Sequence, residues 1–218
     1  MPGRRAAITL APGCLRTDSQ AMSFDPVYTL LRNLTSPLAA ITTSAGGVRN
    51  GLIVNSAQRA SLVPTIPRIS IYISKINFTH DLIYRGGVFT LHLLRNDQWD
   101  VIYRLGFETG RDGDKLNAFE LLEGKTGCPI LRDCMAGFEC EVVNAMDTGA
   151  STFFLGQVVN VHTGREGALM TSEYFRAHLP VERAAQYEAN LKAAAAQLEA
   201  LTRQIDREKV WPGAVLAP

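Results

Sequence analysis

The sequence has almost no net charge. Its 22 Lys and Arg residues nearly balance 21 Asp and Glu residues, which leaves +1 at neutral pH. Binding to a nucleic acid or an anionic membrane surface depends on an excess of positive charge, so neither partner is expected. An uninterrupted apolar run of about 18 residues, which a membrane-spanning helix needs, is also missing. We therefore expect no transmembrane helix.

Cysteines are few, and their spacing suits no usual zinc site. They are Cys14, Cys128, Cys134 and Cys140. The last three are separated by five residues each time, which matches no common pattern of metal ligands. We interpret them as reduced, partly buried thiols of a cytoplasmic protein. A redox relay is the alternative, and no metal site is predicted.

We expect no secretion signal either. The apolar run over residues 6–11 is too short for a secretory signal and is broken at Pro12. We expect residues 1–23 to be a disordered or misassigned extension, and the folded part to begin near residue 24.

Short segments with alternating apolar residues dominate the middle of the chain. Residues 68–74 place Ile69, Ile71 and Ile73 on one face, and residues 88–94 alternate in the same way around His92. Further strands are expected over residues 37–43, 51–55, 138–143 and 152–161, with a hairpin turn at 44–47 and a linker over 144–151. Six or seven short strands separated by turns predict a mainly β fold, a closed or nearly closed antiparallel barrel with α additions.

The helices expected before residue 180 are few and short. They cover residues 26–33, 79–86, 99–107 and 115–122. The C-terminal part differs, because residues 181–209 are rich in strong helix formers. Its apolar residues follow 4-3 spacing along one face, which is a heptad seam: Tyr187, Leu191, Ala194, Leu198, Leu201 and Ile205. The seam packs on its own barrel or pairs two subunits; the sequence leaves both open.

The stretch over residues 50–58 (NGLIVNSAQ) contains the first candidate binding residues. Asn50 and Gly51 form a predicted turn, and a brief buried strand follows. Small and amide side chains come next, where a core would need bulk. They allow a flat ligand close to the backbone and can bond its carbonyls and ring nitrogens: Asn55, Ser56, Ala57 and Gln58.

A second candidate stretch begins about twenty residues later. Hydroxyl, ammonium and amide groups precede a helix expected to start at Thr79, namely Ser74, Lys75 and Asn77. Such groups beside a helix N-terminus form an anion site of the kind that holds phosphate. A ring site and a phosphate site one strand apart indicate a nucleotide-like cofactor.

Six segments together resemble the flavin reductase-like family, the FMN-binding split barrels. They keep the family's order and approximate spacing, and cover residues 36–43, 50–57, 73–83, 127–131, 138–142 and 154–159. The resemblance extends over about residues 24–178. Residues 179–218, with the long helix, lie outside it and are a possible dimerisation element.

The resemblance implies a homodimeric six-stranded split β-barrel that binds FMN, or alternatively FAD, near the dimer interface. Residues 55–58 would line the isoalloxazine ring, with Thr42 and Asn50 as weaker candidates at the flavin edge. Ser74, Lys75, Asn77 and Thr79 would hold the phosphate. NADH or NADPH would deliver hydride to the flavin, and the reduced flavin would serve an acceptor such as a partner monooxygenase. No acid–base pair is then needed, and no catalytic residue is predicted.

One feature departs from the family. Many members carry a His in the turn before the last strand, near the nicotinamide, whereas residues 147–151 (DTGAS) have none. The departure leaves open an FMN-binding electron-transfer protein that NAD(P)H does not reduce. A barrel that binds no flavin, or an interaction module built on the terminal helix, is a further alternative.

Overall fold

The computed structural model describes residues 30–31, 33–209 and 211. It divides the chain into two compact units, Met1–Leu34 and Thr35–Pro218. In the first unit Leu30 and Leu31 are helical, and the remainder of the helix expected over residues 26–33 lies almost entirely outside the described residues. The extension over residues 1–23 and Cys14 also lie outside them.

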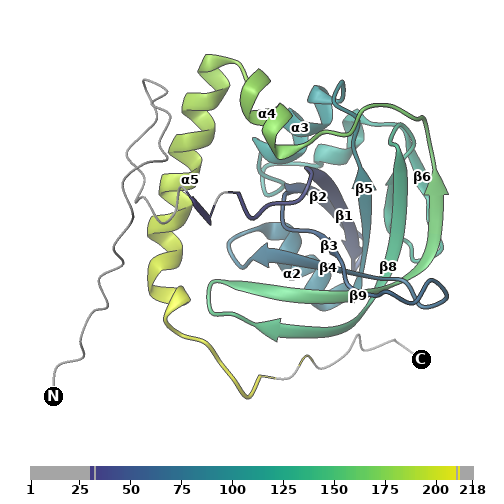
Figure 1. The fold of residues 1–218 in the computed structure, drawn as a ribbon. Coiled ribbons are helices and arrows are strands. Elements are labelled where there is room, and N and C mark those ends of the chain that lie inside the picture. Colours follow the sequence, from purple (N-terminus) through teal and green to yellow (C-terminus); the bar gives the residue numbers. More distant parts are fainter. Residues whose placement is uncertain (1–29, 32, 210, 212–218) are drawn as a thin grey trace, which may run out of the picture. The chain divides into compact units, whose positions relative to one another are not determined.

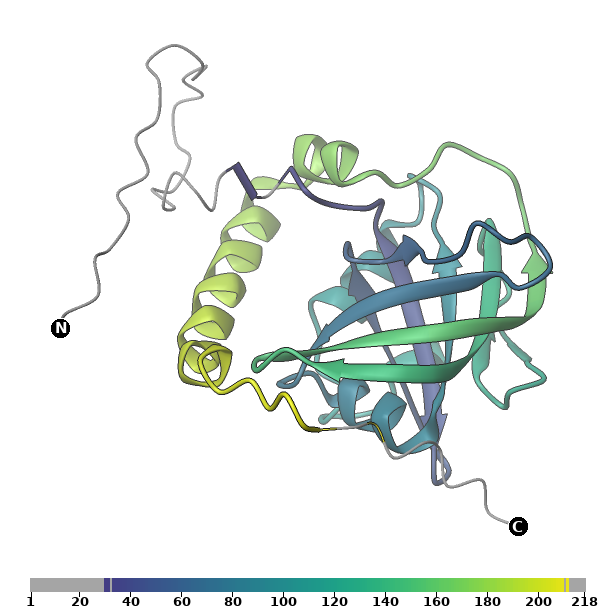
Figure 2. The ribbon, with the colours of Figure 1, turned by 60° about the horizontal axis from the view of Figure 1, so that its bottom comes forward.

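Seven strands of the second unit form one antiparallel sheet, which curls around its inner face (Figures 1 and 2). Their order is β2-β1-β5-β8-β9-β4-β3. The strands are β1 (Ala39–Ala45), β2 (Val48–Val54), β3 (Gln58–Arg59), β4 (Arg68–Ser74), β5 (Val88–Leu93), β8 (Ala136–Asp147) and β9 (Ser151–Thr163). A separate hairpin contains β6 (Leu121–Glu123) and β7 (Pro129–Leu131). The predicted mainly β fold is confirmed.

The first hairpin corrects the prediction of a turn at Asn50 and Gly51. The hairpin turn lies at Gly46 and Gly47, which have φ angles of +57° and +77°, so the turn predicted over residues 44–47 is confirmed. Gly51 instead pairs with Thr42 inside the sheet. A Cβ there would stand 3.1 Å from the Ile41 carbonyl oxygen, so close packing explains this glycine.

The prediction of a linker over residues 144–151 is also wrong. β8 continues through Asp147, and a tight turn leads directly into β9. The pairing register shifts between Val142 and Asn144. This bulge interrupts the alternation of inward and outward residues, so the last third of β8 shows no strand pattern in the sequence.

The described helices are α2 (Phe78–Gly86), α3 (Trp99–Gly106), α4 (Ser172–His178) and α5 (Val181–Thr202). α2 and α3 match their predictions, and Gly87 ends α2 in the left-handed conformation at φ +66°. The helix expected over residues 115–122 is a single 3₁₀ turn, Lys115–Ala118, followed by β6. α4 was not predicted. Among the described residues, every helix is too short or too polar to cross a membrane.

Two apolar clusters stabilise the second unit. One fills the curl of the sheet around Ile71, Phe89 and Phe154, all fully buried. The other joins the sheet to α3 and α4, with Ile102 and Phe175 among its members. Burial of such side chains is the main favourable term in folding.

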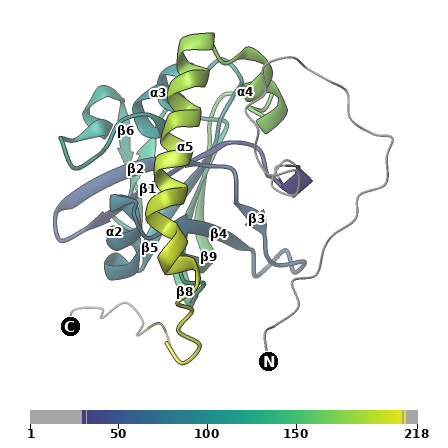
Figure 3. The same cartoon turned by 90° about the vertical axis from the view of Figure 1, so that its left-hand side faces the viewer.

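The long helix α5 ends at Thr202 rather than near residue 209. None of its residues is buried, although the predicted seam is half-buried from Tyr187 to Leu201. Contacts are recorded at both ends of the helix: Tyr187 packs against Phe175, and the Leu201 carbonyl lies beside Gly149 in the turn between β8 and β9. Figure 3 shows α5 running past β1, β2 and β4.

Candidate functional site

The junction between β4 and α2 holds the predicted phosphate residues. Ser74 ends β4, and its hydroxyl is buried without a hydrogen-bond partner among the described residues. Asn77 occupies the N-cap position of α2, but its side chain caps no N–H group. The first N–H groups of a helix have no carbonyl partner within the helix. The junction therefore combines an orphaned hydroxyl with an uncapped helix start.

Lys75 lies at the same junction, but it already has an anionic partner. Its Nζ donates to Asp147 Oδ2 at 2.6 Å, and the Asp147 side chain is only 5% exposed. Burial alone would raise the pKa of Asp147, but hydrogen bonds from Lys75 and the Gly149 amide outweigh it and hold the pKa below its usual range. Lys209 Nζ approaches the same oxygen at 3.7 Å. Asp147 is thus an anion between two cations.

Thr79 and Asn50 meet behind this junction. Asn50 Nδ2 donates to Thr79 Oγ1 at 3.0 Å, and both residues are almost fully buried. Thr42 is fully buried too, with its hydroxyl donating to the Pro129 carbonyl. The side chains of these three predicted residues therefore connect elements within the fold: Asn50 joins β2 to α2, and Thr42 joins β1 to β7.

The predicted ring residues lie in the connection from β2 to β3. Ser56 Oγ donates to the Tyr72 carbonyl at 2.9 Å, and the Ala57 amide donates to Ser36 Oγ. Asn55 and Gln58 are exposed. The connection is thereby fixed against β4, while its two amide side chains face outward.

The fold brings the two predicted stretches together. Ser56 contacts Tyr72, which precedes Ser74 by two residues on β4. A strand rises about 3.3 Å per residue, so the two positions are roughly 7 Å apart. That separation is on the scale of the chain that joins a flavin ring to its phosphate.

The turn between β8 and β9 completes this end of the sheet. Thr148 Oγ1 lies 3.0 Å from the Tyr72 hydroxyl, and the Lys75 amide donates to the Ala150 carbonyl. His80 is the nearby histidine: its Nε2 lies 2.8 Å from Thr152 Oγ1. Burial lowers the pKa of His80, against the raising effect of Asp81, so the imidazole is neutral at pH 7.

Three residues of the site are not among the candidates predicted from the sequence. Tyr72 is 43% exposed beside Ser56; its alternation with buried isoleucines was the available signal. The sequence draws attention to the turn that contains Asp147 only because this turn lacks a histidine. Arg111 donates to the Ile76 carbonyl and places its guanidinium 5.7 Å from the centre of the Phe78 ring. No local pattern links Arg111 to the start of α2.

The three cysteines that the structure describes take no part in the site. Cys128, Cys134 and Cys140 are buried and free, as predicted. Burial raises the pKa of each thiol, to about 11 for Cys134. Thiols held in this protonated form are poor nucleophiles.

Comparison with known proteins gives a family match over most of the chain. The profile of the family described as "Flavin reductase like domain" matches residues 31–181. A high molecular weight rubredoxin from Moorella thermoacetica is 31% identical over 147 residues, 66% of this chain and 63% of that protein. The NADH-dependent flavin reductase StyB from Pseudomonas fluorescens is 34% identical over 112 residues, 51% of this chain and 62% of that protein. The chain thus spans less than two thirds of the length of both relatives.

Solved structures share the same fold. An FMN-binding protein from Thermus thermophilus, crystallised with 1-cyclohex-2-enone, is 25% identical with a TM-score of 0.57. The match covers 68% of this chain and 80% of that one. The curled sheet is therefore the split β-barrel that the sequence predicted.

Proposed function

This chain belongs to the family of flavin reductase like domains, and we propose that it is an NAD(P)H-dependent flavin reductase. In this proposal it binds FMN, or FAD, and takes its electrons from NADH or NADPH. The reduced flavin then serves an acceptor such as a partner monooxygenase. The similarity to StyB, which is named as an NADH-dependent flavin reductase, supports a nicotinamide nucleotide as the reductant.

The buried hydroxyl of Ser74 is the observation that carries the proposal. A buried hydroxyl without a partner costs stability, and this one stands beside an uncapped helix start. A phosphate there would accept from Ser74 Oγ and from the first N–H groups of α2, at Phe78 and Thr79. The residues present therefore fit the phosphate of a flavin nucleotide.

The ring is assigned to the surface between residues 55–58 and Tyr72. Asn55 and Gln58 offer exposed amides, and Tyr72 offers an aromatic side chain. Amides suit the carbonyls and nitrogens of the isoalloxazine edge, and an aromatic side chain suits its face. Thr42 and Asn50, being buried, position these strands rather than touch the ring.

A bound flavin supplies the redox chemistry by accepting hydride from the nicotinamide and passing electrons onward. The chain binds and orients both rings so that the reacting atoms meet. Neutral His80 and the Lys75–Asp147 pair lie at the phosphate end, so we assign them no proton transfer. Thr148 and Tyr72, whose hydroxyls lie 3.0 Å apart, replace the absent histidine as the polar groups beside the nicotinamide.

A second candidate is an FMN-binding electron carrier reduced by another protein. The turn from Asp147 to Ser151 favours it, because this turn carries no imidazole. Tight FMN retention without oxidation of NADH or NADPH would support the carrier.

We also propose a cytoplasmic homodimer. The half-buried seam of α5, from Tyr187 to Leu201, supports a role for this helix in pairing subunits. Three free cysteines suit a reducing compartment.

The deciding experiment is the visible absorption spectrum of the purified protein, before and after anaerobic addition of NADH or NADPH. A flavin band that bleaches supports the reductase. A flavin band that stays favours the carrier, and no band after adding FMN or FAD contradicts both.

A further inference from the structure

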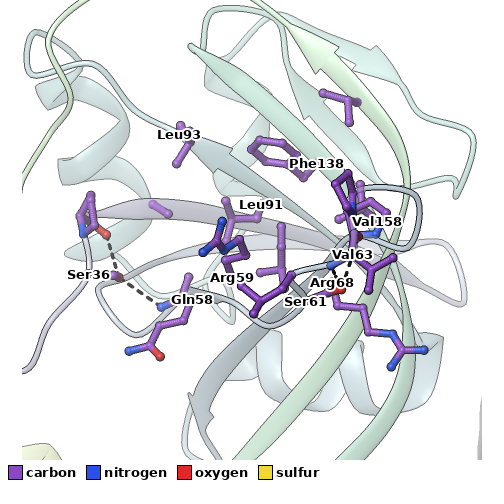
Figure 4. A pocket seen from close by; sticks show the side chains of 18 residues that line it. Ser36, Gln58, Arg59, Ser61, Val63, Arg68, Leu91, Leu93, Phe138 and Val158 are labelled. Carbon is purple, nitrogen blue, oxygen red and sulfur yellow. Dashed lines mark hydrogen bonds between the residues drawn. The ribbon is translucent and has the colours of Figure 1, made fainter.

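A cavity lies on the inner face of the sheet, next to the connection assigned to the flavin ring. Its volume is about 490 Å³, and it opens between β3, the connection over residues 60–67 and the inner faces of β5, β8 and β9 (Figure 4). We call it the mouth pocket. Ile69 on β4 lines it, whereas Tyr72 points to the other face because successive strand residues alternate.

The walls of the mouth pocket are apolar. Leu91, Leu93, Phe138 and Val158 form its depth (Figure 4). At its rim Leu62 is 83% exposed. Ligand pockets of about 300–1,000 Å³ with apolar walls and a few polar groups are typical of small-molecule sites, so the walls suit an apolar ring system.

The charged residues of the mouth pocket are both arginines. Among the described residues, Arg59 and Arg68 line it and no Asp or Glu does. Arg68 directly precedes Ile69, so its side chain leaves β4 on the other face, whereas Arg59 pairs with Ile69 and lies on the face of the pocket. Arg68 Nε donates to the neutral Gln157 Oε1 at 3.3 Å. Neither guanidinium forms an ion pair with a carboxylate in the part of the chain that the structure describes. The pocket therefore presents uncompensated positive charge next to apolar walls.

We propose that the mouth pocket binds a small aromatic or alicyclic carboxylate. The ring body packs against Leu91, Phe138 and Val158, and the carboxylate is held by Arg59. Guanidinium groups match carboxylates through paired, charge-assisted hydrogen bonds. Burying the ring supplies the remaining affinity.

This site stands independently of the proposed flavin reductase activity. Ala57 and Gln58 contribute to its lining, so an occupant would lie beside the connection assigned to the flavin ring. Binding to the mouth pocket can nevertheless be measured on protein that carries no flavin.

The test uses three naphthalene probes that share the ring system and carry an anionic, a neutral or a cationic substituent. Fluorescence titration of the full chain compares 2-naphthoate, neutral 2-naphthamide and cationic 2-naphthylmethylamine. We expect naphthoate to bind at least roughly tenfold more tightly than the amide, the scale of one charge-assisted hydrogen bond, and the amine to bind more weakly than the amide.

Substitutions then locate the binding. Arg59→Gln should remove the preference for the anion and leave naphthamide binding unchanged. Arg68→Gln, on the other face of β4, should leave the binding of both probes unchanged. Arg132→Gln is the control, because Arg132 is an exposed arginine paired with Glu120 away from the pocket. Leu62→Asp, at a fully accessible position, should weaken both naphthoate and naphthamide without unfolding the chain.

Three results would overturn the proposal. Equal binding of acid and amide would remove the role of Arg59. Stoichiometric displacement of naphthoate by FMN would make the mouth pocket the flavin ring site. Sedimentation measures whether subunits associate. If naphthoate binding disappears as they associate, the pocket is occupied by a second copy of the chain. If naphthoate binds as expected while flavin does not, the flavin reductase proposal fails and this one stands.

Discussion

Lys75 Nζ lies 2.6 Å from Asp147 Oδ2, and this ion pair ties the start of α2 to the turn between β8 and β9. The cation expected to hold a phosphate is thus already neutralised by a carboxylate of the same chain. Because Asp147 is only 5% exposed, water screens the pair little. A flavin phosphate must compete with Asp147 for Lys75.

Removing the carboxylate should therefore strengthen phosphate binding. Asp147→Asn keeps the acceptor for the Gly149 amide but frees Lys75, and we expect FMN to bind roughly three- to tenfold more tightly, up to about 1.4 kcal/mol. Riboflavin, which lacks the phosphate, should bind as before. In the D147N background, Lys75→Ala should weaken FMN by about 1.5–3 kcal/mol. Fluorescence quenching titrations measure all five dissociation constants. Equal changes for FMN and riboflavin would mean that the phosphate binds elsewhere.

Arg111 should contribute to the same phosphate. It stands at the start of α2, next to Phe78, and it is exposed. An exposed ion pair is worth about 0–1 kcal/mol, so Arg111→Gln should weaken FMN up to about fivefold at low salt and less at high salt. Exposed Arg132 supplies the matched control, Arg132→Gln. An effect that survives high salt unchanged would contradict an electrostatic role.

The site shows which parts of a fold can be predicted from sequence. Residues 68–74 alternate without interruption, and β4 matches them to the residue. The stretch from Ser74 to Thr79 is contiguous, so its residue types alone suggested an anion site. Arg111 and Asp147 come from distant parts of the chain. Only tertiary packing brings them to α2, and no local pattern records it.

The wrong predictions have equally specific causes. Gly51 was assigned to a turn because glycine favours turns, but here it allows β2 to approach Leu105 and the Ile41 carbonyl. The end of β8 was missed because its bulge breaks the alternation. Local residue type cannot separate a glycine required by φ from one required by packing.

His92 should make the free energy of unfolding decrease as the pH falls through the mildly acidic range. The imidazole is fully buried, its Nε2 accepts from the Leu131 amide, and burial lowers its pKa to about 4. The unfolded chain binds the proton near pH 6.5, so stability is complete above that value and falls as the pH drops towards 4. The expected loss is on the order of 3 kcal/mol. Urea unfolding against His92→Gln checks it; a difference between the two proteins that is constant from pH 7 to pH 4.5 would contradict it.

Lys115 should make the free energy of unfolding depend on pH in the alkaline range. Its Nζ donates to the carbonyls of Leu105 and Glu108, and burial lowers its pKa to about 8. Between pH 8 and 10.5 the unfolded chain keeps a proton that the folded chain has lost, so stability rises with pH, by on the order of 3 kcal/mol over the full interval. Urea unfolding at pH 7 and 9.5, compared with Lys115→Met, measures the rise. A wild-type advantage that shrinks at the higher pH would contradict the assignment.

Gly149 should hold the C-terminal end of α5. Its φ is +82°, and a Cβ there would stand 2.5 Å from the Leu201 carbonyl oxygen. Gly149→Ala must therefore bear left-handed strain, which costs about 1–3 kcal/mol, and must also push α5 away. Gly47→Ala is the matched control, because Gly47 has φ +77° but open space around its Cβ position.

The two alanine variants separate backbone strain from the helix contact. Urea unfolding should show a larger loss for Gly149→Ala, and limited proteolysis should show faster cleavage over residues 203–209 in that variant alone. Equal losses with equal cleavage would mean that the Leu201 contact adds nothing to the strain. In that case α5 would be held by its Tyr187 end, through the rings of Phe107 and Phe175, and the other end of the seam would be free to pair with a second subunit.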